Sequence, residues 1–184
     1  MDITVIGRGS IGGGLADLWE QAGHQVVRLG RGGGDAGHAD AVLLAVPGDV
    51  VADALSSVAG LAGRTVLDAT NLYGGSRPPR GASSNAEFVR TVTGGPTAKA
   101  FSTNFASLFG RVAGARARPS NLWAGDDAAA EVVERLSLDA GYEAVRLGDL
   151  GMAATQEALA GPLFSIMQSG LGPFVYRMAP PEEL

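Results

Sequence analysis

Short apolar runs alternate along the chain with segments in which apolar residues recur every three or four positions. The first run, Asp2–Ile6, predicts a strand, and it is followed by Ile11, Leu15, Leu18 and Ala22 at the spacing of one helix face. Further strands are expected at Gln25–Leu29, Ala39–Val46, Thr65–Asp68, Thr97–Phe101, Asn121–Ala124 and Glu143–Leu147. The run Ala39–Val46 is nearly all apolar, as in a parallel strand covered on both faces. The pattern therefore predicts an α/β fold with a doubly wound parallel sheet.

Three further helices are expected between these strands. Asp49–Val58 predicts one, and Ser84-Asn85-Ala86-Glu87 has the form of a capping box that begins the next. Asp126 and Asp127 are expected to cap the third. A loop rich in Gly, Pro and Arg is expected over Ala69–Ala82.

The pattern changes at about Asp149, which divides the chain into a main domain, 1–148, and a small C-terminal segment, 149–184. Helices are expected at Met152–Ala160, Leu163–Ser169 and Phe174–Met178, with interruptions at Gly161-Pro162 and Gly172-Pro173. The segment is too apolar to lie open in water and too short to form its own core. It either caps the sheet of its own subunit or forms a homodimer interface through Leu159, Leu163, Phe164, Ile166, Met167 and Leu171.

A glycine-rich motif follows the first strand directly and opens the first helix. It reads Gly7-Arg8-Gly9-Ser10-Ile11-Gly12. In a Rossmann-type dinucleotide-binding unit the three glycines allow the tight turn, the approach of the backbone to a pyrophosphate, and close packing of helix on strand. Free N–H groups at the start of the helix then hold the phosphates. The strand before and the helix after the motif favour this interpretation over a purely structural turn.

The end of the second strand distinguishes the two nicotinamide dinucleotides. An acidic residue about 20 positions beyond the glycines binds the ribose hydroxyls of NAD. Here the chain instead reads Gly30-Arg31, and a guanidinium can pair with the 2′-phosphate of NADP. NADP(H) is therefore favoured, although Arg31 could be a solvated loop charge and Asp35 could curl back to the ribose.

Composition narrows the classes of function that remain. The 184 residues carry a net charge of −5, which argues against a nucleic-acid partner. There are no cysteines, which excludes disulfides and thiolate metal sites, and only two histidines, so no metal site is expected. Neither a leader nor a long apolar run is visible, so we expect a cytoplasmic protein without a membrane partner. His24 lies in an expected turn and is interpreted as structural.

Seven segments, in their order and spacing, resemble the NADPH-dependent reductases of the deazaflavin coenzyme F420 and their close relatives. They are Gly-Arg-Gly-Ser-Ile-Gly-Gly-Gly-Leu-Ala (7–16), Ala-Gly-His-Gln-Val-Val (22–27), Leu-Leu-Ala-Val-Pro (43–47), Asp-Ala-Thr-Asn (68–71), Lys-Ala-Phe-Ser-Thr (99–103), Ala-Gly-Asp-Asp (124–127) and Gly-Leu-Gly-Pro (170–173). The resemblance covers nearly the whole chain. It implies NADP(H) as cofactor and coenzyme F420 as co-substrate.

The resemblance also implies roles for particular residues. The motif from Gly7 to Gly12 would bind the pyrophosphate, and Gly30-Arg31 the 2′-phosphate. At the end of the third strand, the ribose would be lined by Ala45, Val46 and Pro47. Near the nicotinamide would lie Thr70 and Asn71, which follow the fourth strand, and Ala100 and Phe101 at the end of the fifth. The chain departs from the family pattern at Gly48, Leu72 and Ser102, which lie around the presumed acceptor pocket.

We therefore expect an NADPH-dependent oxidoreductase that passes hydride to a flavin-like acceptor. The competing hypotheses are a reductase of another small substrate, such as a carbonyl or imine, and a redox sensor that binds NADP(H) without turnover. The segments Asn71–Arg80 and Phe101–Phe109 indicate a cleft for a second ring, which favours an enzyme. No catalytic residue is assigned, because hydride transfer asks little acid–base chemistry of the protein.

Charged residues near this cleft have two interpretations each. Lys99, the only lysine, either orients the nicotinamide region or an anionic acceptor, or it pairs with a nearby carboxylate at a strand end. A basic rim for an anionic acceptor could come from Arg77, Arg80, Arg111, Arg116 and Arg118. For each of these arginines a solvated surface role is the alternative.

Overall fold

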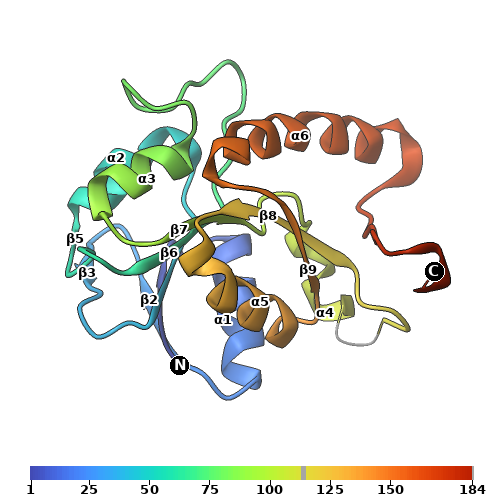
Figure 1. The fold of residues 1–184 in the computed structure, drawn as a ribbon, viewed down its shortest axis with the longest axis horizontal. Coiled ribbons are helices and arrows are strands. Elements are labelled where there is room, and N and C mark those ends of the chain that lie inside the picture. Colours follow the sequence, from blue (N-terminus) through green and yellow to red (C-terminus); the bar gives the residue numbers. More distant parts are fainter. Residues whose placement is uncertain (113–114, 184) are drawn as a thin grey trace.

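A computed structural model describes residues 1–112 and 115–183, and it contains a seven-stranded, mostly parallel sheet (Figure 1). In the order β2-β1-β4-β6-β7-β8-β9, the strands are Gln25–Leu29, Asp2–Ile6, Ala41–Leu44, Thr65–Asp68, Thr97–Ala100, Ser120–Gly125 and Glu143–Gly148. The expected α/β fold with a Rossmann-like sheet is confirmed. A separate pair of very short strands, β3 (Gly34–Asp35) and β5 (Val58–Ala59), is an addition that the sequence pattern did not predict.

The last two strands run against the rest of the sheet. β8 pairs antiparallel with β7, whereas β9 is parallel to β8. The connection from β7 stays at the end of the sheet where β7 finishes, so β8 enters in the opposite direction. Only the first five strands of the main sheet therefore share the parallel order that the apolar runs predicted.

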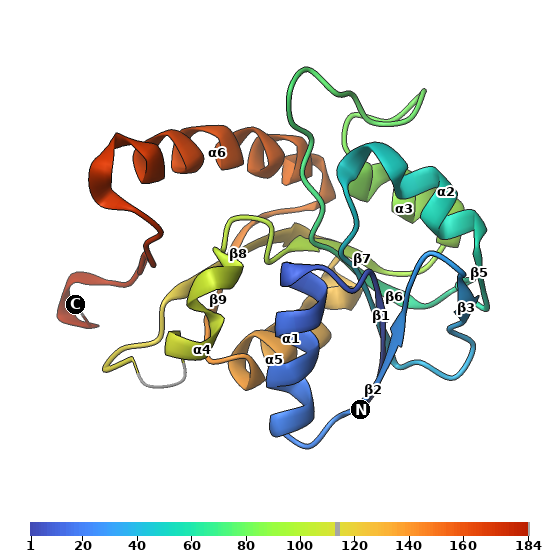
Figure 2. The same cartoon turned by 180° about the vertical axis from the view of Figure 1, so that it is seen from behind.

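Helices cover both faces of the sheet (Figures 1 and 2). α1 (Ser10–Gln21), α4 (Phe109–Val112) and α5 (Ala130–Asp139) lie on one face, and α2 (Val51–Ser56) and α3 (Asn85–Thr93) lie on the other. Each face has its own apolar core, and β4 shows why: Ala41 and Leu43 belong to the first core, whereas Val42 and Leu44 belong to the second. The nearly continuous apolar run of this strand is thus explained by burial on both faces.

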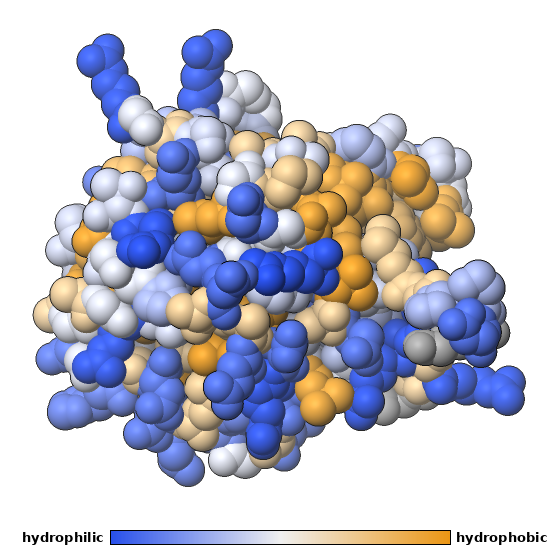
Figure 3. Space-filling view, in the orientation of Figure 1, coloured by the Kyte–Doolittle hydropathy of each residue, from blue (hydrophilic) through white to orange (hydrophobic). Residues whose placement is uncertain are grey.

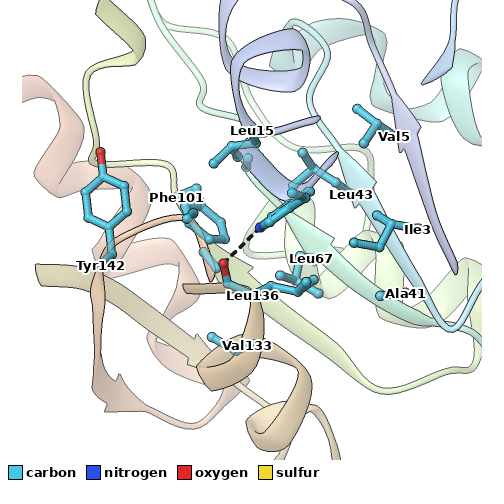
Figure 4. Packing of buried hydrophobic residues seen from close by; sticks show 14 of the residues in the cluster. Ile3, Val5, Leu15, Ala41, Leu43, Leu67, Phe101, Val133, Leu136 and Tyr142 are labelled. Carbon is cyan, nitrogen blue, oxygen red and sulfur yellow. Dashed lines mark hydrogen bonds between the residues drawn. The ribbon is translucent and has the colours of Figure 1, made fainter. Parts of the chain in front are cut away.

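The α1 side of the sheet holds the larger side chains (Figure 4). The Trp19 indole N–H donates to the Leu136 carbonyl of α5 over 2.9 Å, and Leu15 and Phe101 lie in the same cluster. Of the expected stripe of α1, Leu15 is buried and Ile11 and Leu18 pack partly buried against this core, whereas Ala22 is exposed. The fully buried face of the helix consists of Gly12, Leu15, Ala16 and Trp19.

Two expected helix starts have different outcomes. The Ser84 hydroxyl accepts the Glu87 N–H at the start of α3, as expected of a capping box. Asp126 and Asp127 do not cap α5 with their side chains. Asp126 instead accepts the Thr97 N–H and pairs with Arg90, because Thr97 and Arg90 lie within its reach across the sheet edge.

The C-terminal segment also differs from expectation. α6 (Ala153–Ile166) continues through Gly161 and Pro162, because the carbonyl that loses its N–H partner belongs to exposed Ala158 and can face water. The helix then ends in an irregular turn over Met167–Leu171, where Gly170 has a φ of 109°. Phe174–Met178 is not helical; it lies extended beside β8, where the Ser120 N–H donates to the Tyr176 carbonyl over 2.8 Å.

α6 lies across the edge of the sheet at which the parallel strands end (Figures 1 and 2). It contacts β7, β8 and α3. Within residues 1–112 and 115–183, no helix is both long and apolar enough to cross a membrane.

Candidate active site

The glycine turn between β1 and α1 is packed so closely that side chains do not fit. Gly7 has a φ of +114°, and a Cβ on it would lie 2.1 Å from the Ala45 carbonyl oxygen. A Cβ on Gly12 would lie 2.2 Å from the Gly7 carbonyl oxygen. Around a Cβ on Gly9, by contrast, nothing lies within 4 Å. The turn is therefore closed toward the sheet and open at Gly9, which fits a pyrophosphate approaching the backbone.

The start of α1 is also free to receive an anion. Gly9 occupies the N-cap, no side chain caps the helix, and its first turn holds no acidic residue. The N–H groups of a helix's first turn have no partner within the helix, and the positive end of the helix dipole lies there. Gly9 and Ser10 face a cavity at this point.

This first cavity has a volume of about 500 Å³ and runs along the ends of β1, β4 and β6. It brings together eight of the residues that the sequence proposed for the cofactor: Gly9, Ser10, Ile11, Ala45, Val46, Pro47, Thr70 and Asn71. Its remaining walls come from Gly48, Asp49, Ala69, Tyr73 and Ser76. Ligands of open parallel sheets bind at this end of the strands.

Two arginines lie at the end of β2, where the sequence placed a 2′-phosphate. The Arg8 guanidinium donates to the Arg28 carbonyl through Nε over 3.2 Å and Nη2 over 2.8 Å. This conformation places Arg8 beside Gly30, where a Cβ would meet its Nε at 3.4 Å. Arg31 follows as an exposed residue. Asp35 engages its own turn, accepting the Gly37 N–H over 2.6 Å, instead of curling toward the ribose position.

A second cavity of about 230 Å³ adjoins the first. The two share Ile11, Ala69, Asn71 and Tyr73 as lining residues. Its other walls come from two segments far apart in the sequence: Ser102, Thr103, Asn104, Phe105 and Ala106 after β7, and Ala160, Leu163, Phe164 and Met167 of α6 and the turn after it. None of these lining residues is acidic or basic, so the second cavity suits an uncharged, largely apolar group.

Asn71 stands at the junction of the two cavities. Its Nδ2 donates to the Ser102 carbonyl over 2.6 Å and to the Tyr73 hydroxyl over 3.2 Å, while its buried Oδ1 has no hydrogen-bond partner among the described residues. Gly48 allows this placement, because a Cβ there would lie 2.3 Å from the Asn71 carbonyl oxygen. The departure from the family pattern at Gly48 therefore has a steric reason.

Ala100 and Phe101 lie elsewhere than expected. Both are fully buried in the core on the α1 side and line neither cavity. The Phe101 ring packs edge-on against Trp19 and Tyr142. Phe101 has a φ of 61°, a strained conformation for a non-glycine residue, and the resulting turn directs Ser102 and Thr103 to the second cavity.

Lys99 is fully buried and lies beneath the junction. Its Nζ donates to Asp68 Oδ2 over 2.9 Å, to Glu157 Oε1 over 2.8 Å, and to the Thr70 carbonyl. Burial of Glu157 raises the pKa of its carboxyl, helped by nearby Asp68 and opposed by Lys99. The interpretation of Lys99 as a partner of carboxylates fits this geometry, whereas contact with a ligand does not, because no part of Lys99 is exposed.

The other arginines are dispersed. Arg77 and Arg80 are exposed on the loop between β6 and α3, which also carries Tyr73. Arg111 is exposed on α4 and lines neither of the two adjoining cavities. Arg116 and Arg118 line a separate cavity of about 760 Å³ with Leu18 and Leu138, and this cavity shares no residue with the first two. Among the described residues, no cluster of His, Cys, Asp and Glu could hold a metal ion.

Sequence reasoning missed most of the second cavity. The segment Phe101–Phe109 was expected to help form a cleft. The contribution of Leu163, Phe164 and Met167 was not, because these residues were expected to cap the sheet or to form a homodimer interface. Tyr73 and Asn104, which also line the second cavity, belong to no sequence motif that would have pointed to a role in the site. His24 is structural as expected, because its ring is buried and pairs with Asp139 over 2.8 Å.

Solved structures share this fold. The putative F420-dependent NADP reductase of Arthrobacter sp. FB24 superposes with a TM-score of 0.77 at 23% identity, covering 98% of this chain and 100% of that one. A hypothetical protein of Sinorhizobium meliloti gives 0.66 at 25% identity, with coverage of 84% and 88%. A reductive aminase of Aspergillus terreus, in complex with NADPH and ethyl levulinate, gives 0.66 at 19% identity and covers 92% of this chain. This chain spans 63% of that aminase.

No protein-family model and no curated protein sequence matches the chain. The resemblance inferred from the sequence is confirmed at the level of the fold, since a structure of that description covers 98% of the chain. The chain therefore shares its fold with a putative F420-dependent NADP reductase and with a reductive aminase solved with NADPH.

Proposed function

We propose that this protein is an NADPH-dependent oxidoreductase that transfers hydride between NADP(H) and a flavin-like acceptor, the deazaflavin coenzyme F420. The observation that carries the proposal is the pair of adjoining cavities that meet at Ile11, Asn71 and Tyr73. A hydride donor in the first cavity and a planar acceptor in the second would lie against each other at that junction. Direct transfer requires this kind of contact between the reacting carbons.

NADP(H) would occupy the first cavity. Gly7, Gly9 and Gly12 and the start of α1 would receive the pyrophosphate, with Ala45, Val46 and Pro47 beside the ribose. Arg8 and Arg31 at the end of β2 would pair with the 2′-phosphate, since guanidinium groups bind phosphate oxygens through paired hydrogen bonds. Arg8 thus joins the 2′-phosphate site, although the sequence placed it in the pyrophosphate turn.

The acceptor ring would occupy the second cavity. Phe105, Leu163 and Phe164 supply apolar contact area there, and Asn71 and Asn104 supply amide groups for ring polar atoms. At about 230 Å³ the cavity suits a ring system alone, so the phosphate and acidic tail of a deazaflavin would extend outside it. Arg77 and Arg80, on the loop that carries Tyr73, are the basic groups best placed to meet that tail.

The protein would act by positioning and by excluding water. The nicotinamide coenzyme supplies the hydride when bound. The uncharged lining of the second cavity would keep the reacting face apolar, and the proton taken up with the hydride would come from solvent at the cavity mouth. No side chain is assigned as an acid or base.

We include a homodimer and a cytoplasmic location in the proposal. The end of α6 and the residues after it expose apolar side chains (Figure 3): Phe164, Ile166, Leu171, Val175 and Met178. Such a patch favours association with a second copy. Light scattering of Leu171→Asp/Val175→Asp protein should show monomer where the wild type is dimeric; a monomeric wild type would refute this part.

The test of the reaction is anaerobic mixing of the protein with NADPH and oxidised coenzyme F420, following the deazaflavin absorbance. NADH and FMN replace each substrate in turn as controls. We expect bleaching of the deazaflavin with NADPH as the donor, no bleaching with NADH, and no oxidation of NADPH by FMN. NADPH oxidation only with ketones or imines would establish the other reductase class, and tight NADPH binding without any turnover would establish a sensor.

A further inference from the structure

The buried Lys99 is bound on three sides by groups from different parts of the chain. Its ammonium meets Asp68 at the end of β6, the Thr70 carbonyl just beyond it, and Glu157 on α6. An ammonium has three donors, so each hydrogen of Lys99 has an acceptor. Removing a charge of this kind from water is unfavourable unless its partners are well placed. The cluster therefore needs all three segments in register.

Glu157 extends the cluster to a fourth segment. The same Oε1 that receives Lys99 also accepts the N–H of Asn85 over 3.1 Å, at the start of α3. Asn85 Nδ2 in turn donates to Thr70 Oγ1 over 2.9 Å and to the Gly48 carbonyl over 3.0 Å. The two ends of the loop from Thr70 to Asn85 are thus tied to each other and to α6 at one point.

α6 is docked mainly by polar and small residues. Its buried positions are Ala153, Gln156, Glu157 and Ala160. Gln156 Nε2 donates to the Leu122 carbonyl over 2.8 Å and to Ser102 Oγ over 3.2 Å. Apolar packing tolerates small shifts, but paired polar contacts fix one position. The helix turn that follows supplies Ala160, Leu163 and Phe164 to the second cavity.

We propose that Lys99 and Glu157 are positioning residues for the hydride acceptor. The pair holds the loop that carries Asn71 and Tyr73 and the helix that carries Leu163 and Phe164 as two walls of the second cavity. Neither residue lines the first cavity, where the glycine turn would hold NADP(H). The loop that carries Asn71 and Tyr73 lines both cavities, but α6 lines only the second. Breaking the pair should therefore weaken binding of the acceptor more than binding of the cofactor. This inference rests on the proposed function for its kinetic consequence, but its structural consequence can be measured without turnover.

Two substitutions at Glu157 and one elsewhere make the test. Glu157→Ala severs the link, and Glu157→Gln keeps the shape and removes only the charge. Asp139→Asn is the matched control, because Asp139 pairs with buried His24 and with Arg135 far from both cavities. Its effect on thermal unfolding gives the scale for a purely structural loss of a carboxylate.

Hydrogen exchange of the backbone is the first readout. Glu157→Ala should speed exchange in residues 70–85 and in residues 153–168 together, and Asp139→Asn should do so in neither. Exchange that rises in only one of the two segments, or in neither, would overturn the proposal. Glu157→Gln should fall between wild type and Glu157→Ala, and it keeps the test decisive where the alanine variant does not fold.

Kinetics is the second readout. The KM for oxidised coenzyme F420 should rise about tenfold in Glu157→Ala, as for the loss of one charged hydrogen-bonded contact, with a clearly smaller rise in the Kd for NADPH. A parallel rise in both constants, or an equal rise in Asp139→Asn at the same loss of thermal stability, would show a structural role only. A wild type that leaves coenzyme F420 untouched would refute the proposed function, while the exchange result would still decide whether the pair ties the two walls together.

Discussion

The two adjoining cavities are built in opposite ways. The first is formed largely by backbone and small residues within the first 76 positions, around a turn in which Gly7 and Gly12 leave no room for a side chain. The second is formed by residues from four separate segments, with α6 brought in from the far end of the chain. One site is local in sequence, and the other exists only when distant elements are docked.

This difference explains why the two sites respond differently to change. Backbone N–H groups at the start of α1 remain when a neighbouring side chain is replaced, so the first site depends on a few glycines and arginines. The second site depends on the position of α6, and hence on buried polar contacts such as those of Glu157 and Gln156. We expect substitutions to separate cofactor binding from acceptor binding accordingly.

Gly12→Val should have the largest effect, because a Cβ at Gly12 would lie 2.2 Å from the Gly7 carbonyl oxygen. The turn must then move, and NADPH binding, measured by the fluorescence of the bound coenzyme, should be lost. Gly13→Ala is the matched control, since the nearest atom to a Cβ there is 3.7 Å away. Tight NADPH binding by Gly12→Val would show that the cofactor lies elsewhere.

Arg31→Ala and Arg8→Ala should each weaken the binding of NADPH and leave the binding of NADH unchanged. A charge-assisted hydrogen bond to phosphate contributes about 1.5–3 kcal/mol, so the Kd for NADPH should rise roughly tenfold to a hundredfold for each variant. Titration calorimetry with both coenzymes makes the comparison, and Arg111→Ala serves as an arginine control away from β2. An equal loss for NADPH and NADH would argue against a 2′-phosphate at these arginines.

Phe164→Ala should act on the acceptor alone. Phe164 lines the second cavity and is 45% exposed, whereas Ile166, which is 46% exposed on the same helix, does not line it. Partial loss of an aromatic contact should raise the KM for the acceptor severalfold with NADPH binding intact. Ile166→Ala, assayed at the same protein concentration, should leave both constants unchanged. A similar effect of the two substitutions would remove α6 from the acceptor site.

The smallest expected effect is a pH dependence of stability, which should have opposite signs at buried Glu157 and partly buried Asp139. Burial and nearby Asp68 raise the pKa of Glu157 above its usual 4.5, despite Lys99. The folded state then holds a proton that the unfolded state has lost, so stability falls as the pH rises through the window above 4.5. At Asp139, burial acts to raise the pKa of the carboxyl, but the hydrogen bonds from Arg135 and His24 outweigh it and lower the pKa below 3.8. Its contribution is present above 3.8 and is lost as the pH falls.

Urea unfolding across this pH range measures both contributions. Glu157→Gln should become more stable relative to wild type as the pH rises, and Asp139→Asn should lose its deficit as the pH falls below 3.8. The same sign in both variants would contradict the assigned environments.

The sequence predicted what depends on local pattern. The five parallel strands, the glycine turn and the position of Gly30-Arg31 followed from apolar runs and glycine spacing. Features set by long-range contact were not predictable in this way. Phe101 followed the family's cofactor pattern but is buried against Trp19 and Tyr142. Gly161-Pro162 normally interrupts a helix, yet α6 continues because the affected carbonyl can face water.

The acceptor site shows the same limit. No spacing rule connects Lys99, Glu157 and Asn85, which are joined only through the folded sheet edge. Gly48 was visible as a departure from the family, but its reason, the close approach of the Asn71 carbonyl, required the structure.

The most direct test of the central claim is to follow deuterium from NADPH labelled at C4 into coenzyme F420 under anaerobic conditions. The nicotinamide C4 carries one hydrogen on each face, and NADPH is labelled on one face at a time. Because the two cavities meet at Asn71, we predict that deuterium reaches the reduced deazaflavin from only one of the two labelled forms. The account also predicts that labelling this face slows the bleaching. Bleaching in which the deuterium is lost to water, or no bleaching at all, would contradict direct hydride transfer between adjoining sites.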